Sequence, residues 1–332
     1  MTDNLRFSDM PDGAAVPHVA MVLIERFQFL ALGAQAAFEL ANAVVGEDFY
    51  SLGIYSVSGG PIKSSSGLDV PTVALSEAGP IDTLLLMAGM TPPPIQEDAA
   101  LAVMRQAAKE ARRVAGICTG SFLVAQLGLL DGQRATTHWA YAQHMRDCFS
   151  KIVVEGDRIF INQGSVWTSA GLTAGLDMAV ALVEKDLGAD VAGAVARRMV
   201  MHHRRAGGQS QHSELLDLAP SSDRIQKVLI YAKSHLANPL TIEELADVAA
   251  LSPRQFSRAF QAETGRSPAK AIELLRLEAA RILLDNTRHG LEAVARETGF
   301  SDLRRMREAF MRQYGQSPQA LRREARGVLV GA

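Results

Sequence analysis

The stretch GFSDLRRMREAFMRQYGQSP, residues 299–318, decides what the C-terminal part of this chain is. It follows a short helix that we expect over Leu291–Glu297, and it opens with a turn that contains Gly299. A second helix is expected from about Asp302 to Tyr314, ending at Gly315, since glycine is the residue type that most often closes a helix. Two helices joined by a tight turn make a helix-turn-helix unit.

The second expected helix has one apolar face and one basic face. Met306 and Phe310 lie four residues apart and therefore share the buried face. Three arginines then face outward: Arg304, Arg305 and Arg307. Arginine is well suited to guanine edges and to phosphates, so the pattern predicts a DNA-recognition helix. An arginine-rich surface on a plain helical bundle is the alternative.

The same pattern occurs about fifty residues earlier. Residues 241–244 (TIEE) form a capping box that opens a helix, and its expected apolar face consists of Ile242, Leu245, Ala246 and Ala249. After a turn at Ala250-Leu251, the sequence Ser252-Pro253-Arg254-Gln255 has the residue types that start a second helix.

This second helix of the first unit also has a buried and an exposed face. Phe256 and Phe260 share the buried face, and the residues left outside are Arg254, Ser257 and Arg258. A long helix over Pro268–Asn286 joins the two units. Because major grooves on one face of DNA recur every ~34 Å, two linked units predict binding to double-stranded DNA.

Charge is unevenly distributed along the 332 residues. Residues 222–332 hold 18 Lys and Arg against 13 Asp and Glu, whereas residues 1–221 hold 16 against 23. Only the basic half suits a polyanion, although a solvated basic surface would look the same. Two cysteines, Cys118 and Cys148, imply no disulfide framework. No apolar run approaches the ~20 residues that span a bilayer. The polar start lacks a signal-peptide pattern. We therefore expect a cytoplasmic protein with no membrane contact.

The N-terminal half alternates strand-like and helix-like segments. Buried strands are expected at His18–Ile24, Thr83–Met87 and Arg113–Ile117, and a hairpin around Gly156-Asp157. Helices are expected over Phe29–Val45, Ile95–Lys109, Gly120–Leu127 and Ser169–Leu187. The alternation predicts a flavodoxin-like α/β sandwich with a mostly parallel sheet. The C-terminal half is expected to be all-α, with two helix-turn-helix units.

The segment Gly116-Ile117-Cys118-Thr119-Gly120 lies between an expected strand and an expected helix. This is the spacing of a nucleophile elbow, with Cys in place of Ser. We expect the following helix to lower the pKa of the Cys118 thiol. The backbone N–H groups of Thr119 and Gly89 would form an anion-binding pair. A buried structural cysteine is the alternative.

Residues 224–325 resemble the DNA-binding domain of the AraC/XylS family, above all in residues 299–318. The resemblance implies sequence-specific binding to operator half-sites and contact with RNA polymerase. By position, the base-contacting residues of the family fall on Arg254, Ser257, Arg258, Arg304, Arg305 and Arg307. The stretch Leu303–Arg305 varies between members, so no base preference transfers.

Residues 18–190 resemble the PfpI/ThiJ group, which has the class I glutamine amidotransferase fold. The resemblance rests on Val114–Tyr141 and on residues 167–171 (WTSAG), and residues 207–211 (GGQSQ) resemble a segment of sensor-regulators. The group contains amidases, proteases, isocyanide hydratases and the sensor domains of one AraC subfamily. Known inducers in that subfamily are largely amino acids, betaines and carnitine. The resemblance implies a homodimeric domain that senses a small-molecule effector, and we expect no cofactor and no metal.

Two departures argue against catalysis at Cys118. Hydrolytic members place a His after the Cys, where this chain has Thr119. The hydratases share Cys-Thr-Gly-Ser but rely on an Asp where Ala31 falls here, so the thiol lacks an acid or base partner. We therefore expect a sensor and not an enzyme. The alternatives are a cysteine-dependent hydrolase or hydratase with a DNA-binding tail, and a DNA-bound scaffold without a ligand.

The expected ligand pocket is built on this former active site. Cys118 and Thr119 would form its floor, and Gly89, His138 and Trp167 its walls. The helix start after Cys118 suits a carboxylate, and Trp167 would cover an ammonium group.

Four segments are expected along the chain. They are a flexible N-terminus at 1–17, a sensing and dimerisation domain at 18–200, a linker at 201–222 and a DNA-binding domain at 223–326.

Overall fold

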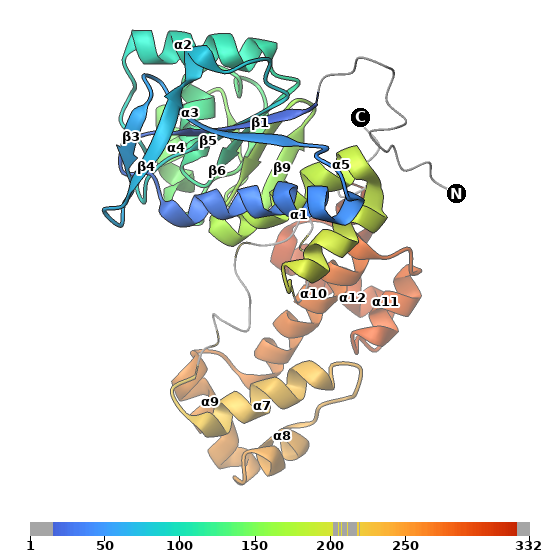
Figure 1. The fold of residues 1–332 in the computed structure, drawn as a ribbon. Coiled ribbons are helices and arrows are strands. Elements are labelled where there is room, and N and C mark those ends of the chain that lie inside the picture. Colours follow the sequence, from blue (N-terminus) through green and yellow to red (C-terminus); the bar gives the residue numbers. More distant parts are fainter. Residues whose placement is uncertain are drawn as a thin grey trace. The chain divides into compact units, whose positions relative to one another are not determined.

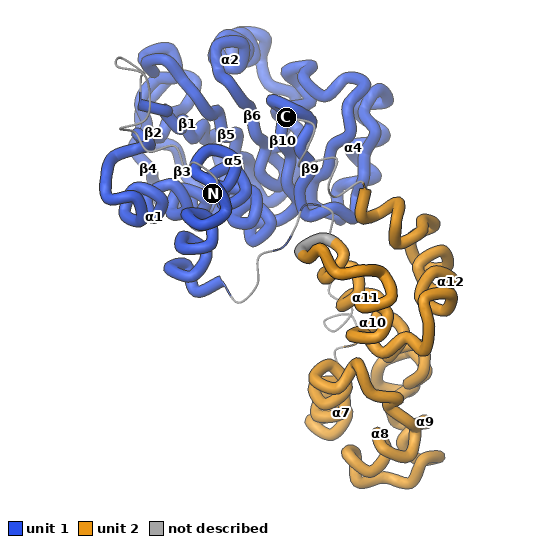
Figure 2. Tube along the Cα trace, turned by 90° about the vertical axis from the view of Figure 1, so that its right-hand side faces the viewer, with its two compact units in different colours: residues 1–207, 331–332 blue, residues 208–330 orange. Residues whose placement is uncertain are grey.

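The computed structural model describes residues 16–201, 205, 207, 211, 218 and 220–323, without the side chains of residues 285 and 286. Its contacts divide the chain into two units, residues 1–207 with 331–332 (unit 1) and residues 208–330 (unit 2) (Figure 2). The expected N-terminus at 1–17 and linker at 201–222 fall mostly outside the described residues, as do residues 208–210 of the GGQSQ motif.

Unit 1 is built on an eight-stranded sheet with the order β3-β4-β2-β1-β5-β6-β10-β9 (Figure 1). The strands are β1 His18–Leu23, β2 Ser51–Ser56, β3 Gly60–Lys63, β4 Asp69–Ala74, β5 Thr83–Met87, β6 Arg113–Ile117, β9 Phe160–Gln163 and β10 Val166–Ser169. The six inner strands are parallel, and β3 and β9 pair antiparallel at the two edges. The predicted, mostly parallel sheet is confirmed.

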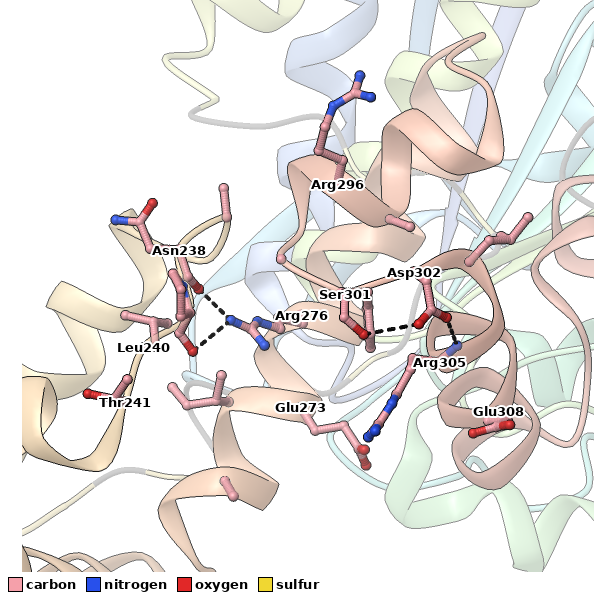
Figure 3. A pocket seen from close by; sticks show the side chains of 18 of the residues that line it. Asn238, Leu240, Thr241, Glu273, Arg276, Arg296, Ser301, Asp302, Arg305 and Glu308 are labelled. Atoms are coloured by element: carbon pink, nitrogen blue, oxygen red, sulfur yellow. Dashed lines mark hydrogen bonds between the residues drawn. The ribbon is translucent and has the colours of Figure 1, made fainter.

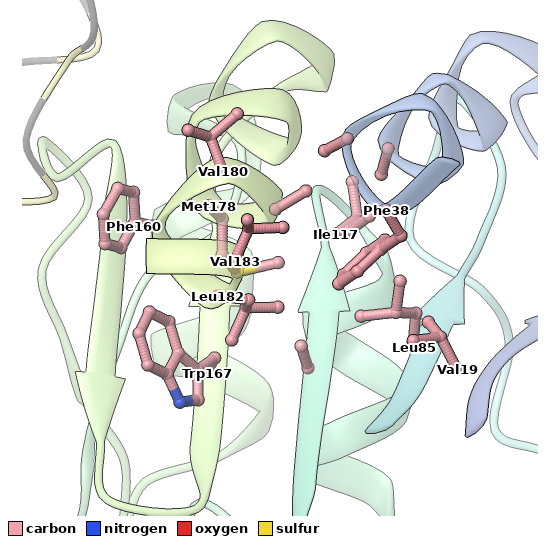
Figure 4. Close-up of a cluster of buried hydrophobic side chains, with 14 of the residues drawn as sticks. Val19, Phe38, Leu85, Ile117, Phe160, Trp167, Met178, Val180, Leu182 and Val183 are labelled. Atoms are coloured by element: carbon pink, nitrogen blue, oxygen red, sulfur yellow. The ribbon is translucent and has the colours of Figure 1, made fainter. Parts of the chain in front are cut away.

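Helices cover both faces of this sheet because alternate residues of each strand point to opposite sides. In β1, Val19 and Met21 enter one core, whereas Ala20 and Val22 enter the other. The first core packs against the 3-10 helix η2 (Phe29–Ala34), α1 (Gln35–Val45) and α5 (Leu172–Arg198); Figure 4 shows part of it. The second packs against α2 (Asp98–Glu110), α3 (Gly120–Gln126) and α4 (Ala142–Cys148). Short 3-10 turns are η3 (Leu75–Glu77) and η4 (Trp139–Tyr141).

The hairpin expected around Gly156-Asp157 is wrong. β8 (Val153–Val154) pairs parallel with β7 (Arg134–Ala135), and the hairpin joins β9 to β10 through Gly164, whose φ is +66°. Gly156 serves packing instead, since an added Cβ would lie 2.6 Å from the Ala142 side chain. A positive φ is what a two-residue hairpin turn needs, and Gly164 supplies it.

Three expected helices begin later than predicted. The helix expected from Ile95 begins at Asp98. The segment from Phe29 starts as η2 and becomes α-helical only at Gln35. The last helix of unit 1 begins at Leu172, not Ser169, and continues to Arg198 across a break at Gly188, where φ is +82°. Glycine adopts this left-handed backbone without steric cost.

Unit 2 is entirely helical in its described part. Its helices are α7 Asp223–Ser234, α8 Ile242–Val248, α9 Pro253–Thr264, α10 Pro268–Asn286, α11 Leu291–Glu297 and α12 Leu303–Tyr314. They enclose two separate cores, one around Phe256 and Phe260 and the other around Met306 and Phe310. The predicted helical C-terminal part with its helix-turn-helix units is confirmed.

The starts of α8 and α9, in the first helix-turn-helix of unit 2, show how local sequence determines where a helix begins. Ser252 caps α9 as expected, and with Gln255 it forms a reciprocal capping box. Thr241 caps α8 by accepting a bond from the Glu244 N–H, but the Glu244 carboxylate accepts from the Tyr231 hydroxyl of α7 at 2.7 Å. The second half of that predicted capping box is therefore replaced by a contact between α7 and α8.

Candidate nucleic-acid interface and sensor site

Helix α9 presents a polar face opposite its two buried phenylalanines. Phe256 and Phe260 pack edge to face, with ring centroids 5.5 Å apart. On the far side Arg254 and Arg258 are exposed, whereas Ser257, the residue after Phe256, is half-buried at the flank of the helix. Two of the three predicted residues of the first helix-turn-helix therefore lie on the side of α9 away from its core.

Asp302 caps the start of helix α12, since its carboxylate accepts a 2.8 Å bond from the Arg305 N–H. This bond holds the pKa of Asp302 below its usual range. Arg304 points to solvent with 81 % of its side chain exposed and lies 3.6 Å from Glu308. Like Arg254 before Phe256, it stands two residues before the first buried residue of its helix, Met306.

The other two predicted arginines of α12 lie to either side of Arg304. Arg305 lines a groove between the two halves of unit 2, and Arg307 lies beside Gln319. The outward position of Arg254 and Arg304 on two matching helices suits contact with base edges, whereas Arg305 and Arg307 flank it.

The backbone forms the predicted elbow at Cys118. Its φ is +56°, and its N–H donates to the Ser169 carbonyl of β10 at 3.1 Å. The following turn approaches β5 so closely that a Cβ on Gly120 would lie 2.1 Å from the Leu86 carbonyl oxygen. A left-handed residue between strand and helix is the geometry that a nucleophile elbow requires.

The expected lowering of the Cys118 pKa is wrong. The thiol is buried, with 8 % of the residue exposed, and this burial raises its pKa above the ordinary value. Hydrogen bonds from Thr119 act in the opposite direction but are outweighed. Burial disfavours the charged thiolate, which is the nucleophilic form.

Four of the five predicted pocket residues lie on segments that meet at the elbow. The Thr119 hydroxyl donates to the Gly89 carbonyl at 2.6 Å, so Gly89 meets Thr119 through its C=O group. The Thr137 hydroxyl donates to the Cys118 carbonyl at 3.0 Å, which brings the neighbouring His138 to the same edge of the sheet. His138 caps η4 by accepting from the Ala140 N–H.

The structure does not bring Trp167 to this site. In the sheet register it lies beside Ala115, three residues before Cys118, and only 4 % of it is exposed. Its ring stacks on Phe160, and Lys185 Nζ lies 5.8 Å from its centroid. Figure 4 shows the ring inside the core, so the position expected for a ligand ammonium is taken by Lys185.

Sequence reasoning missed Ser169, the last residue of β10. It is fully buried, and among the described residues its hydroxyl has no hydrogen-bond partner. The Ser169 carbonyl accepts the hydrogen bond from the Cys118 N–H, so the unpaired hydroxyl belongs to a residue that contacts the elbow directly. Residues 167–171 were recognised as a motif, but nothing in the sequence indicates that one hydroxyl in it is unpaired.

The residues that the structure describes contain no group of three or more His, Cys, Asp and Glu side chains placed to hold a metal ion. Within the same residues no helix has the length and apolar character to cross a membrane.

Each of the two units matches a model of a known protein family. Residues 245–324 match the helix-turn-helix domain model, and residues 35–185 match the DJ-1/PfpI family model. The chain is 30 % identical over 245 residues to the HTH-type transcriptional regulator ArgR of Pseudomonas aeruginosa, covering 74 % of each chain.

Two further likenesses concern unit 1. An isonitrile hydratase of Pseudomonas putida is 37 % identical over 134 residues, 40 % of this chain and 58 % of that protein. A crystal structure of an AraC family transcriptional regulator from Pseudomonas putida shares the fold, with TM-score 0.50 and 16 % identity over 55 % of this chain and 99 % of the other. The chain thus belongs to the family of HTH-type transcriptional regulators that carry a DJ-1/PfpI domain before an AraC-type DNA-binding domain.

Proposed function

We propose that this regulator responds to a small nitrogenous metabolite, such as an amino acid, a betaine or a similar amine, bound beside Cys118. One observation carries the proposal: the elbow is fully formed, yet burial raises the pKa of its thiol. The backbone is held in a strained left-handed conformation although burial disfavours the reactive thiolate, which favours binding over chemistry at this site.

The residues at the elbow support a polar ligand. Ser169 holds a buried hydroxyl without a partner among the described residues, and buried hydroxyls nearly always have one. We propose that the ligand supplies this partner, in a site that also includes Gly89, Cys118, Thr119 and His138. Trp167 belongs to the adjoining core and not to the site.

We further propose how the ligand controls transcription. Two chains pair through unit 1, α9 and α12 of each chain bind operator half-sites, and the bound regulator contacts RNA polymerase in the cytoplasm. The ligand acts by binding one arrangement of the dimer more tightly than the other, because only a difference in affinity shifts an equilibrium. We assign sensing and pairing to residues 18–200, connection to 201–222 and DNA binding to 223–326.

The test is a thermal-shift screen of the full-length protein against amino acids, betaines, polyamines and related amines, with mass spectrometry of the same wells. We expect a raised melting temperature with the compound unaltered; a rise of about 2.7 kcal/mol in stability corresponds to ligand at a hundred times its Kd. The variant Cys148→Ser, at the exposed cysteine, should respond like the wild type. Unchanged stability with every compound would contradict the proposal.

A second candidate is a cysteine-dependent hydratase or hydrolase in unit 1. The likeness to an isonitrile hydratase and the intact elbow geometry favour it. In this case the same mass spectra would show a consumed compound, and turnover would be lost in Cys118→Ser but kept in Cys148→Ser.

A further inference from the structure

Unit 2 has two halves, the first made of α7, α8 and α9 and the second of α11 and α12. Each half has its own apolar core, and helix α10 contributes to both cores. Leu275 of α10 packs into the first core and Leu277 into the second. Direct contacts between the halves add to this shared helix in holding α9 and α12 relative to each other. These contacts lie along a groove of about 1010 Å³ between the halves (Figure 3).

Arg276 of α10 donates hydrogen bonds to the loop between α7 and α8 in the first half. Its Nε donates to the Leu236 carbonyl at 3.2 Å, and its Nη2 donates to the Asn238 carbonyl at 2.6 Å. Figure 3 shows the guanidinium reaching across the groove to this loop. Burial lowers the pKa of Arg276, and the two carbonyl bonds compensate the charge for its partial loss of water.

The turn of the second half presses against the same loop. Gly299, with φ at +76°, lies so close that an added Cβ would be 1.8 Å from the Leu236 carbonyl oxygen and 2.8 Å from Arg276 Nε. Leu236, Arg276 and Gly299 therefore form one junction between the two halves. Its members come from the α7–α8 loop, from α10 and from the turn between α11 and α12.

A second link holds α12 against α10 along the same groove. Arg312 Nη2 of α12 lies 2.7 Å from a Glu273 carboxylate oxygen. Lys270 pairs with the other oxygen of Glu273 at 2.8 Å, and these bonds hold the pKa of Glu273 below its usual range. This pair is partly exposed, so its contribution to stability is small.

We propose that Arg276 is a positioning residue for DNA recognition. Together with Gly299, it sets the separation and rotation of α9 relative to α12, and thereby the spacing between the two DNA elements that one chain reads. One inserted base pair moves the second element by ~3.4 Å and rotates it by about a tenth of a turn. A stiff junction cannot follow that movement, whereas a loosened junction can.

The experiment compares Arg276→Lys with the wild type. Lysine keeps the charge and most of the stem, but one ammonium cannot reproduce the rigid fork that spans two carbonyls. A binding sequence is first selected with the wild-type protein from duplexes randomised over thirty positions. Affinity is then measured at one salt concentration on duplexes whose spacer is unchanged, shortened by one base pair or lengthened by one.

We expect the wild type to lose affinity about tenfold or more per base-pair change of the spacer, the effect of ~1.4 kcal/mol. For Arg276→Lys we expect weaker binding at the best spacing and a loss of less than about threefold at the others. Binding to a duplex with a single element should be the same for both proteins. A merely structural role of Arg276 would weaken all duplexes alike and leave the spacing profile sharp.

Arg281→Lys is the matched control, because Arg281 is on the same helix, lies 4.9 Å from the Tyr314 ring of the second half and does not line the groove. It should lose stability without a change in the spacing profile. If Arg276→Lys shows no cooperative unfolding, Gly299→Ala, which disturbs the same junction, takes its place. A profile as sharp as that of the wild type in whichever of these two variants folds overturns the proposal.

Discussion

At the scale of single residues, the environment of Cys118 decides what unit 1 can do. The backbone places this residue as a nucleophile would be placed, but the buried thiol holds its proton. The second cysteine, Cys148, is exposed on α4 and lies 3.6 Å from the Nε2 atom of His144. The two thiols of one chain therefore differ in their access to solvent and reagents.

We predict that iodoacetamide labels Cys148 much faster than Cys118. The raised pKa means that the Cys118 thiolate appears only above the ordinary thiol pKa of about 8.5, so its labelling should rise with pH beyond that point. Because the folded state favours the neutral thiol, this residue also costs the fold stability as the pH rises through that range. Peptide mass spectrometry at several pH values measures both rates; equal labelling at pH 7 would contradict the prediction.

Ser169→Ala should separate ligand binding from folding. No hydrogen bond among the described residues is lost, so the free protein should be unchanged or gain about 1 kcal/mol, the cost of a buried unpaired hydroxyl. Affinity for the identified ligand should fall about fivefold to tenfold with the loss of one hydrogen bond. Calorimetric titration measures the affinity, and unchanged affinity would remove Ser169 from the site.

At the scale of elements, the two helix-turn-helix turns share one backbone state but not one residue type. Ala250 has φ at +51° in the first turn, where a side chain is strained, and Gly299 has +76° in the second. We predict that Ala250→Gly keeps or raises stability, by up to about 1 kcal/mol, since relief of strain is partly offset by chain entropy.

The mirror substitution, Gly299→Ala, should cost about 2 kcal/mol or more, because it combines the strained φ with the contact to the Leu236 carbonyl. Urea unfolding monitored by circular dichroism measures both variants. A Gly299→Ala variant as stable as the wild type would show that the junction yields easily.

The elements were predictable where local pattern and tertiary packing agree. In α9 and α12 the apolar period, the caps and the closing glycines all indicate the same helix, and the structure has it within one residue. The hairpin at Gly156-Asp157 failed because a glycine needed for packing has the same sequence signature as a turn glycine. The β3–β4 hairpin was not predicted, because the residues of these two strands at the sheet edge are exposed or half-buried and form no apolar run.

The candidate site was predictable only in part. The GICTG segment predicts the tight turn of an elbow at Cys118, because glycines flank the position, and the structure has this turn. The pKa of Cys118 depends on burial by distant segments, and the position of Trp167 depends on sheet register, neither of which local sequence contains. The sequence does not distinguish Arg276 from the other arginines of its helix, because the carbonyl groups that it contacts belong to a loop about forty residues earlier.

At the scale of the whole molecule, the start of the connecting segment is tied to helix α5 of unit 1. Arg205 donates from its backbone N–H and its Nε to the two oxygens of Asp177, at 3.0 and 2.8 Å, and from Nη2 to the Thr173 hydroxyl. Asp177 is buried on α5, the helix that follows Gly171, and Gly171 lies against His138. A ligand that shifts the start of α5 would thus act on the connecting segment.

We predict that Arg205→Gln uncouples the two units. Ligand affinity should stay within about twofold, because the substitution lies outside the site. The ligand-induced change in DNA affinity, typically fivefold or more in coupled systems, should fall toward none. Fluorescence anisotropy of labelled DNA with and without ligand measures this coupling, and an undiminished ligand effect would rule out Arg205 as the link.

The most direct test of the account is a hydroxyl-radical footprint of the full-length protein on DNA selected from a random library. The account predicts pairs of protected segments on one face of the duplex, about one helical turn apart, for each bound chain. Arg254→Ala should remove one segment of each pair and Arg304→Ala the other, because these residues occupy matching positions on α9 and α12. A single protected segment, or loss of the same segment in both variants, would contradict it.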